Sequence, residues 1–518
     1  MIKAWLRREQ AMLTACASGV LLALAFPRPS FAFLAWLALV PMLISSRQHP
    51  FRSGFVTGLV FYGFLLYWLN IVMTTYGRLH PVLSGVAWLL LAGYLALYFG
   101  ATTWLAWRLR ERFSLPVWIT FPVVWIGLDY LREFFLTGFP WGALGYSQLT
   151  YLPLVQSADL FGVYGLTGLI VFSNGVIAHA LSTWSTLRKV PVVAVVCLCL
   201  LFTANLGYGI FKLNQPLDQR EETLKISLVQ GNIDQSVKWN PEWQQKTIDR
   251  YLELSGQGVE TGADLLIWPE SATPFYFQDG RENSTKIRNF SRDHRVGLLF
   301  GSPAYRTEGS GFSLLNSAFV LSREGDVLGR SDKVHLVPFG EYVPLKTFFP
   351  FIDKLVVGVG DFSPGTLTPL DYAGHQLGVL VCYEGIFPEL SRSLVDRGAD
   401  LLVNITNDAW YGRSSAPYQH LSMVRMRAIE NRVWLARAAN TGVSALFAPS
   451  GRTVAATTIF EALQVTETAG LGAGESIYRR TGDTLPALCL GASLFAVLGL
   501  LKKRRQPDTL THGRVSEE

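Results

Sequence analysis

Three side chains in the second half of the chain could together carry out covalent acyl transfer. Glu270 ends the run Asp-Leu-Leu-Ile-Trp-Pro-Glu, Cys382 ends the run Leu-Gly-Val-Leu-Val-Cys, and Lys333 stands between them in the chain. A carboxylate can take the proton of a thiol, an ammonium group can favour the thiolate and hold an oxyanion, and the sulfur can form an acyl-enzyme. A second oxyanion donor could be the backbone N–H after Cys382, if a helix begins at Tyr383. The pattern predicts a cysteine nucleophile.

The same segment also permits a cysteine–histidine arrangement. His335 lies two residues after Lys333, and a Cys–His pair is the commoner arrangement in cysteine proteases. Further histidines in this part of the chain are His294, His375 and His420. Each candidate also has a structural reading: Glu270 as an acid in a first helical turn, Lys333 as a solvated lysine and Cys382 as a small buried hydrophobe. The residue types alone leave both arrangements open.

Strands must bring these side chains to one edge of a sheet. From Thr223 the chain alternates short aliphatic or β-branched runs with polar stretches of helical pattern, such as 241–254 and 420–431. This alternation predicts a layered α/β or α+β domain in which helices cover sheet faces. The expected strands are 224–230, 264–268, 296–301, 317–321, 377–381, 401–405, 433–438 and 443–447.

The rest of the chain is typical of a membrane protein. Half of all residues are hydrophobic and 16% are charged, against roughly 25% charged in a soluble domain. Such a composition excludes a soluble enzyme, a fibre and a disordered chain. Eight apolar runs approach the roughly 20 residues that span a bilayer. They are 11–26, 30–46, 54–73, 82–107, 116–135, 161–183, 190–211 and 484–501.

The distribution of charge predicts the topology and argues against nucleic-acid binding. Residues 214–481 carry a net charge of −4 and the remainder +10, so the basic residues cluster beside apolar runs rather than on the polar segment. Fourteen basic residues fall in the loops of one side and five on the other. Because Lys and Arg stay in the cytoplasm, both termini are predicted to be cytoplasmic. The first run could instead be a signal peptide, with Lys3, Arg7 and Arg8 as its basic region.

This topology predicts three parts of the chain. Residues 1–213 hold seven spans, residues 214–481 form an exported domain, and residues 482–518 hold the eighth span and a cytoplasmic tail. The exported domain contains one cysteine, Cys382, and therefore cannot form an internal disulfide.

Four sequence blocks in a fixed order resemble those of the carbon–nitrogen hydrolase (nitrilase) superfamily. They are Trp-Pro-Glu-Ser, Lys-x-His-Leu-Val-Pro-Phe-Gly-Glu, Cys-Tyr-Glu and Asn-x-Thr-Asn-Asp-Ala-Trp. These blocks lie in an insert between the seventh and eighth apolar runs. In this arrangement the chain resembles one family in particular, the apolipoprotein N-acyltransferases, over essentially its whole length. The resemblance implies Glu270 as general base, Lys333 as oxyanion-stabilising cation and Cys382 as nucleophile. It also implies a nitrilase-like α-β-β-α sandwich, an α+β domain, beside the α-helical membrane bundle.

The resemblance extends to supporting residues. It implies a second acidic residue near the Lys and the Cys, and positions for substrate handling; these are Glu341, Tyr383, Glu384, Trp239 and Trp410. Either tryptophan could instead be a core or interfacial aromatic residue. The run Gly-Phe-Pro-Trp-Gly at 138–142 could line a lipid entrance or form an ordinary helix junction.

The activity implied by the resemblance is phospholipid-dependent N-acylation of lipoproteins. A fatty acyl chain would pass from a glycerophospholipid, through a thioester on Cys382, to the α-amine of S-diacylglyceryl cysteine in an apolipoprotein. The implied location is the inner membrane of a bacterium, with the domain on the periplasmic side. The sequence has no metal-ligand spacing and no phosphate-binding glycine loop, so we expect no cofactor.

Two other functions are compatible with parts of the sequence. A membrane-anchored amidase would use the same three residues with water as the acceptor. A channel, transporter or lipoprotein receptor would carry an inert exported domain, although the spans contain few buried charges and no evident inverted repeat.

Overall fold

Two six-stranded β-sheets form the centre of the segment that follows the seventh apolar run, in a computed structural model that describes residues 2–308, 311–343 and 361–501. The first sheet has the order β12-β1-β2-β3-β4-β5 and the second the order β11-β10-β9-β8-β7-β6. The strands are β1 (Thr223–Gln230), β2 (Leu265–Ile267), β3 (Gly297–Glu308), β4 (Gly311–Leu321), β5 (Val327–Asp332), β6 (Leu370–Tyr372), β7 (His375–Val381), β8 (Leu401–Thr406), β9 (Trp434–Ala439), β10 (Ala445–Phe447), β11 (Thr453–Ala456) and β12 (Leu463–Gly470).

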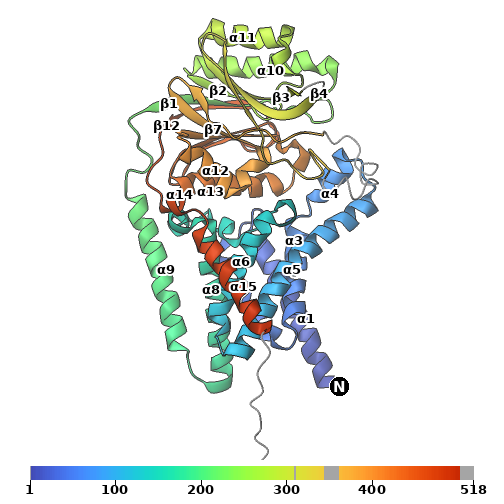
Figure 1. Cartoon of the computed structure of the whole chain (residues 1–518), viewed down its shortest axis with the longest axis vertical. Coiled ribbons are helices and arrows are strands. Elements are labelled where there is room, and N and C mark those ends of the chain that lie inside the picture. The colour runs from blue at the N-terminus through green and yellow to red at the C-terminus, as the bar shows by residue number, and fades with distance from the viewer. Residues whose placement is uncertain (1, 309–310, 344–360, 502–518) are drawn as a thin grey trace, which may run out of the picture.

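The two sheets pack face to face between two layers of helices (Figure 1). Alternate side chains such as Ile226 of β1 and Val379 of β7 share one apolar core between the sheets. A second core lies between the first sheet and its helices, and a third between the second sheet and its helices. The helices of this domain are α10 (Pro241–Glu260), α11 (Glu282–His294), α12 (Pro388–Asp396), α13 (Ala416–Asn431) and α14 (Ile477–Thr481). The predicted layered domain with two helix-covered sheets is confirmed.

All eight predicted strands exist, but β5, β6, β11 and β12 were not expected. β5, β6 and β11 are short strands at or next to sheet edges, and β12 is a half-exposed edge strand. A half-solvated strand lacks the continuous apolar run that marks a buried one, so its pattern is weak. The predicted helix at 241–254 is α10. It begins at Pro241 because the side chain of Asn240 accepts a hydrogen bond from the Glu242 amide.

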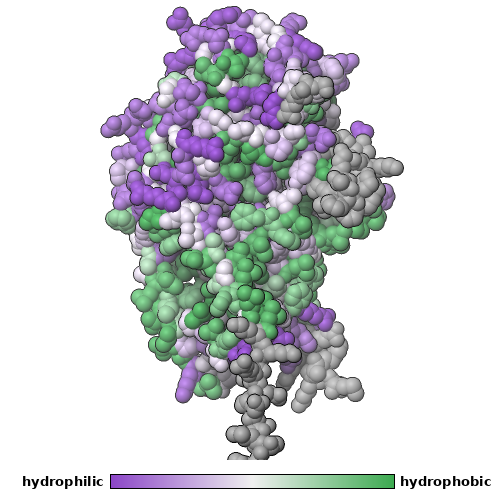
Figure 2. All heavy atoms as spheres, viewed as in Figure 1, coloured by the Kyte–Doolittle hydropathy of each residue, from purple (hydrophilic) through white to green (hydrophobic). Residues whose placement is uncertain are grey.

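The helical half of the chain carries an apolar outer surface (Figure 2). Its helices are α1 (Ile2–Ala25), α2 (Val40–Ser45), α3 (Pro50–Leu65), α4 (Leu69–Ile71), α5 (Pro81–Phe113), α6 (Val117–Phe134), α7 (Leu152–Val155), α8 (Ala158–Leu187), α9 (Val192–Leu213) and α15 (Thr484–Leu501). Within the described residues, four of them are long and apolar enough to cross a membrane: α5, α8, α9 and α15. The segment from α3 to Tyr76 would be a fifth, bent by 55°.

The predicted count of eight spans is therefore not confirmed, and each shortfall has a local cause. The run 30–46 is broken into short helical pieces that include α2. The apolar part of α1 covers only Glu9–Ala25. α6 carries Asp129, Arg132 and Glu133 in its last two turns, too many charges for a typical spanning helix. The predicted tail at 502–518, which begins with the basic run 502–505, lies outside the described residues.

Helix α13 fixes the two-sheet domain to the helical half. At its start, the Gln419 side-chain oxygen accepts hydrogen bonds from the indoles of Trp68 (3.3 Å) and Trp141 (2.8 Å). Just past its end, the buried Arg432 guanidinium donates to Asp159 at the beginning of α8 (2.9 Å). The segment 138–142 contains Trp141, which is buried in this contact, so it forms a packed junction between the two halves.

Candidate active site

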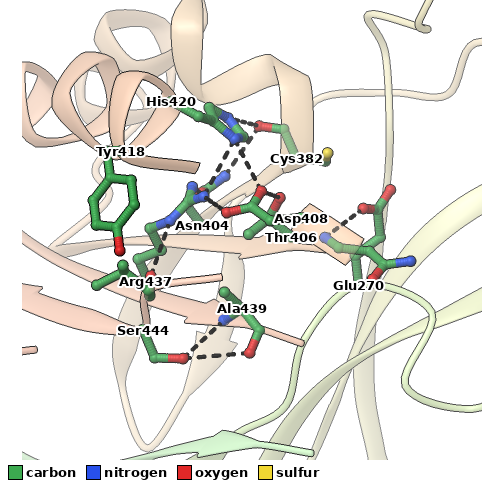
Figure 3. A network of polar contacts seen from close by, with 12 residues as sticks. Glu270, Cys382, Asn404, Thr406, Asp408, Tyr418, His420, Arg437, Ala439 and Ser444 are labelled. Atoms are coloured by element: carbon green, nitrogen blue, oxygen red, sulfur yellow. Dashed lines mark hydrogen bonds and ion pairs between the residues drawn. The ribbon is translucent and has the colours of Figure 1, made fainter. Parts of the chain in front are cut away.

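Cys382 directly follows strand β7 and begins a short 3₁₀ turn, Cys382–Ile386. Its φ of 55° lies in the left-handed region, which is unfavourable for a side chain other than glycine. Its main-chain oxygen accepts hydrogen bonds from the His420 ring (3.2 Å) and the Asn404 amide (3.3 Å). These two donors hold the strained turn, and Figure 3 shows the sulfur on the side of Glu270 rather than of His420.

A buried ionic network lies beneath this turn (Figure 3). Asp408 pairs with the Arg437 guanidinium at 2.7 Å and with the His420 ring at 3.2 Å, and Arg437 also donates to the Asn404 side chain. Both ring nitrogens of His420 thus have partners, Asp408 on one side and the Cys382 carbonyl on the other. The network positions the backbone of Cys382.

Glu270 follows strand β2 in a tight turn and is buried. One carboxylate oxygen accepts the Asn316 side-chain amide at 2.7 Å and lies 3.7 Å from the Lys333 ammonium. The other accepts the Asn407 backbone amide at 3.0 Å. Asn407 comes directly after strand β8 of the second sheet, so the Glu270 carboxylate bridges the ends of strands from both sheets.

Lys333 follows strand β5, and its ammonium lies 2.9 Å from the Glu341 carboxylate. Asn316 of β4 donates to both Glu341 (2.8 Å) and Glu270. Burial alone would lower the pKa of Lys333, but the carboxylates of Glu341 and Glu270 outweigh it and raise this pKa above its usual range. The lysine therefore stays an ammonium ion between two carboxylates.

The Cys382 thiol is protonated at rest. Burial and the nearby Glu270 carboxylate raise the pKa of this thiol, and the opposing effects of Lys333 and Thr406 are smaller. The Lys333 ammonium lowers the pKa of the thiol, as predicted, but this effect alone does not produce a thiolate. A neutral thiol requires a base at the moment of attack, and Glu270 is the carboxylate that faces it.

The two residues after Cys382 are buried in protein contacts. One Glu384 oxygen accepts the amides of Val334 (2.7 Å) and His335 (3.1 Å), and the other accepts the Val381 amide at 2.7 Å. Burial raises the pKa of Glu384 to about 7. The Tyr383 hydroxyl donates to the Gly138 carbonyl at 3.3 Å. Glu384 thus ties the segment after Lys333 to the end of strand β7.

The structure brings Lys333, and not His335, to Glu270. The His335 ring packs on Phe387 with ring centres 3.9 Å apart, and burial together with the Lys333 charge lowers the pKa of His335 to about 4. His375 lies near Glu222 and Asp400. His294 packs on Phe290, and His420 contacts the Cys382 carbonyl rather than its sulfur. These contacts favour the lysine arrangement over the cysteine–histidine arrangement.

Both tryptophans are exposed. Trp239 is 48% exposed and Trp410 is 38% exposed. The Trp410 ring meets the Tyr76 ring edge-on at 5.2 Å, and the Tyr76 hydroxyl donates to the Ala409 carbonyl at 2.9 Å. Trp410 therefore lies where the domain touches the bent arm that follows α3.

Sequence reasoning missed two residues of the site. Asn316 bridges the two carboxylates, and the ammonium of buried Lys238 donates to the Glu270 carbonyl at 3.2 Å. Lys238 stands in the segment after β1, beside the predicted Trp239, which is the one signal that could have found it. Within the described ranges, no group of three or more histidine, cysteine, aspartate and glutamate side chains is arranged to hold a metal ion.

Comparison with known proteins finds similarity over both halves of the chain. Residues 18–176 match the apolipoprotein N-acyltransferase N-terminal domain, and residues 225–468 match the carbon–nitrogen hydrolase domain. An apolipoprotein N-acyltransferase of Geobacter metallireducens is 47% identical, with 96% of each chain covered. One of Methylococcus capsulatus is 33% identical over 98% of this chain and 99% of its own. Among solved structures, a nitrilase-superfamily amidase of Nesterenkonia AN1 is 23% identical over 51% of this chain and 95% of its own, with a TM-score of 0.38.

Proposed function

The chain belongs to the apolipoprotein N-acyltransferase family, and from this we propose that Glu270, Lys333 and Cys382 move a fatty acyl group from a glycerophospholipid to an apolipoprotein. The acceptor is the α-amine of an S-diacylglyceryl cysteine. Membership of an enzyme family sets aside the channel, transporter and receptor alternatives. The observation that carries the mechanism is a buried carboxylate and ammonium 3.7 Å apart beside a buried, neutral thiol.

In the first step the thiol becomes an acyl-enzyme. Glu270 takes the thiol proton as the Cys382 sulfur attacks the ester carbonyl carbon of the phospholipid. The Lys333 ammonium and the Tyr383 amide, which lies in the first turn of the 3₁₀ helix, hold the oxyanion. The intermediate collapses with loss of the glycerol oxygen, and Glu270 returns its proton to that oxygen. The products are a thioester and a lysophospholipid.

In the second step the acceptor amine replaces the sulfur. Glu270 takes a proton from the amine as its nitrogen attacks the thioester carbonyl, and the same two donors hold the oxyanion. The C–S bond then breaks, and the thiolate takes the proton back from Glu270. The product is an amide at the N-terminus of the lipoprotein, and the enzyme returns to its starting state. This is a ping-pong reaction.

The helical half provides the reason for a membrane setting. Moving an acyl chain from lipid into water costs about 0.8 kcal/mol per CH₂, so the site must accept the chain without exposing it. The domain is docked on the helices through α13, the same helix that contacts the Cys382 turn. Such docking favours a site that receives its donor directly from the bilayer.

The family and the apolar helices make this a bacterial membrane protein. We place it in the inner membrane, with both termini in the cytoplasm and residues 214–481 in the periplasm. Residues 1–213 and 482–518 then form the membrane-embedded parts and the cytoplasmic tail. This topology needs an odd number of crossings before residue 214 and one after residue 481, and the predicted eight runs would meet that requirement. The distribution of basic residues supports it, and so do the short helices at 32–48, which run beside α1 through a hydrogen bond between the Met42 amide and Ser18.

The supporting residues receive distinct roles. Glu341 holds Lys333 in place, and Glu384 ties the lysine segment to the nucleophile strand. Tyr383 supplies the oxyanion amide. Trp239 and Trp410, both half-exposed, would contact the acyl chains of donor and acceptor.

Intact mass spectrometry of the purified protein tests the mechanism. Incubation with phospholipid should add one fatty acyl mass to the wild type and to Cys489→Ala, which removes another buried cysteine, but not to Cys382→Ala or Glu270→Gln. Addition of a diacylglyceryl-cysteine peptide should remove the adduct as the peptide gains the same mass. Loss of the adduct to water at an equal rate without peptide would instead favour a hydrolase. A folded wild-type protein without any adduct would contradict the proposal.

A further inference from the structure

A second lysine is buried beside the base. Lys238 lies between β1 and α10, is 1% exposed, and donates from its ammonium to the Glu270 main-chain carbonyl at 3.2 Å. In the described part of the chain, no ion pair joins Lys238 to a carboxylate. A buried ammonium held by one uncharged carbonyl is costly, so its presence at this position calls for a compensating role.

The charges of the site suggest that role. Glu270 and Glu341 are two carboxylates, against which Lys333 supplies one positive charge. Lys238 supplies a second positive charge against these two carboxylates. The reaction then places a further negative charge on the sulfur or on the oxyanion, and without Lys238 that charge would form in a site that is already negative.

The backbone around Glu270 also needs support. Ser271, the next residue, has a φ of 48°, in the left-handed region that is unfavourable for serine. The hydrogen bond from Lys238 falls on the carbonyl that links Glu270 to Ser271. It therefore holds the turn that aims the Glu270 carboxylate.

We propose that Lys238 is a positioning residue of the acyl-transfer site, one that fixes the Glu270 turn and supplies the second buried positive charge against which the Cys382 sulfur ionises. The inference rests on the proposed role of Cys382 as nucleophile.

Electrostatics agree with this role. Burial lowers the pKa of Lys238 to about 8, while Glu270 and Cys382 act in the opposite direction. The group is therefore mostly cationic at pH 7 and loses its charge above about pH 8. The other groups whose charges act on the Cys382 thiol are Glu270, Lys333 and Asp408, and the Tyr411 hydroxyl also faces the thiol.

Alkylation of Cys382 by iodoacetamide tests the proposal on the full-length protein in detergent, followed by peptide mass spectrometry. The rate reports the thiolate fraction and does not depend on any acyl substrate, so the test stands even if the proposed transfer fails. Lys238→Met should slow alkylation at pH 7 about tenfold, as a rise of one pKa unit would do. Lys238→Arg should stay within about twofold, because the charge remains. Lys246→Met removes an exposed lysine that lies over Trp243 and should change nothing.

The pH dependence separates this role from a merely structural one. In the wild type, acyl transfer measured as kcat/KM should fall above about pH 8 as Lys238 loses its proton, and in Lys238→Arg this fall should move to higher pH because a guanidinium keeps its charge. Wild-type alkylation rates in Lys238→Met would overturn the proposal. If Lys238→Met does not fold, Lys238→Arg decides: an unchanged alkaline limb would overturn the proposal, and a shifted one would support it.

Discussion

At the scale of single residues, Lys333 and His335 differ in what their side chains contact. Lys333 lies between two carboxylates and remains charged, whereas the His335 ring packs on Phe387 and its lowered pKa keeps it neutral at pH 7. Two residues that are neighbours in one sequence block therefore have different physical tasks. In the proposed mechanism the lysine stabilises the oxyanion, whereas the histidine only packs against Phe387.

A pair of substitutions tests this division. Lys333→Met should lower kcat/KM for acyl transfer at least about 100-fold, because it removes an oxyanion donor. His335→Ala should remain within about fivefold of wild type and keep its pH dependence between about pH 5 and 8, because the imidazole stays neutral there. Steady-state kinetics with a fluorescent acceptor peptide would measure both. A folded His335→Ala protein without activity would restore the cysteine–histidine arrangement.

The sequence predicted this site only in part, for reasons that differ between residues. Glu270 and Cys382 were predictable because each follows a short apolar run, which is how strand ends present side chains at a sheet edge. Lys238 and Asn316 were not, because a lone lysine or asparagine is most often solvated. Only the approach of β1, β2 and β4 in one sheet places these two beside Glu270.

At the scale of elements, the turn at Cys382 depends on strands and a helix that lie far apart in the chain. The donors to its carbonyl are Asn404 of β8 and His420 of α13. Arg437 of β9 donates directly to Asn404 and pairs with Asp408, which contacts His420. Burial alone would raise the pKa of Asp408, but Arg437 and His420 outweigh it and lower this pKa to about 2. Asp408 therefore stabilises the folded domain above its unfolded pKa of about 4, and this stabilisation is lost as the pH falls toward 2.

Replacement of Arg437 should change how the stability of the domain depends on pH. Arg437→Met leaves Asp408 buried without its cation and should destabilise the protein by about 3–5 kcal/mol. Its acid unfolding midpoint should move to higher pH, because the Asp408 pKa rises. Arg452→Met removes an exposed arginine paired with Asp218 and should cost less than about 1 kcal/mol. Intrinsic fluorescence during thermal and acid unfolding in detergent would measure both, and equal stability of the two variants would contradict the structural role of the network.

At the scale of the whole molecule, helix α13 connects the Cys382 turn to the membrane helices. Its His420 contacts the nucleophile turn, and Arg432 just after its end pairs with Asp159 of α8. Helix α13 and the residue that follows it therefore link the Cys382 turn to the membrane helices. The sequence could predict a membrane half and a separate α/β domain, but not this connection, because Asp159 and Arg432 are 273 residues apart.

The same connection makes the orientation of the membrane half testable. If residues 214–481 face the periplasm, exposed Gln257 of α10 lies outside and exposed Ser185, near the end of α8, lies in the cytoplasm. In a background with Cys197→Ala and Cys199→Ala, an impermeant maleimide applied to intact spheroplasts should label Gln257→Cys and leave Ser185→Cys unlabelled. After lysis both should react, which controls for reactivity. Labelling of Ser185→Cys before lysis would invert the proposed topology and place the site in the cytoplasm, where an exported lipoprotein could not reach it.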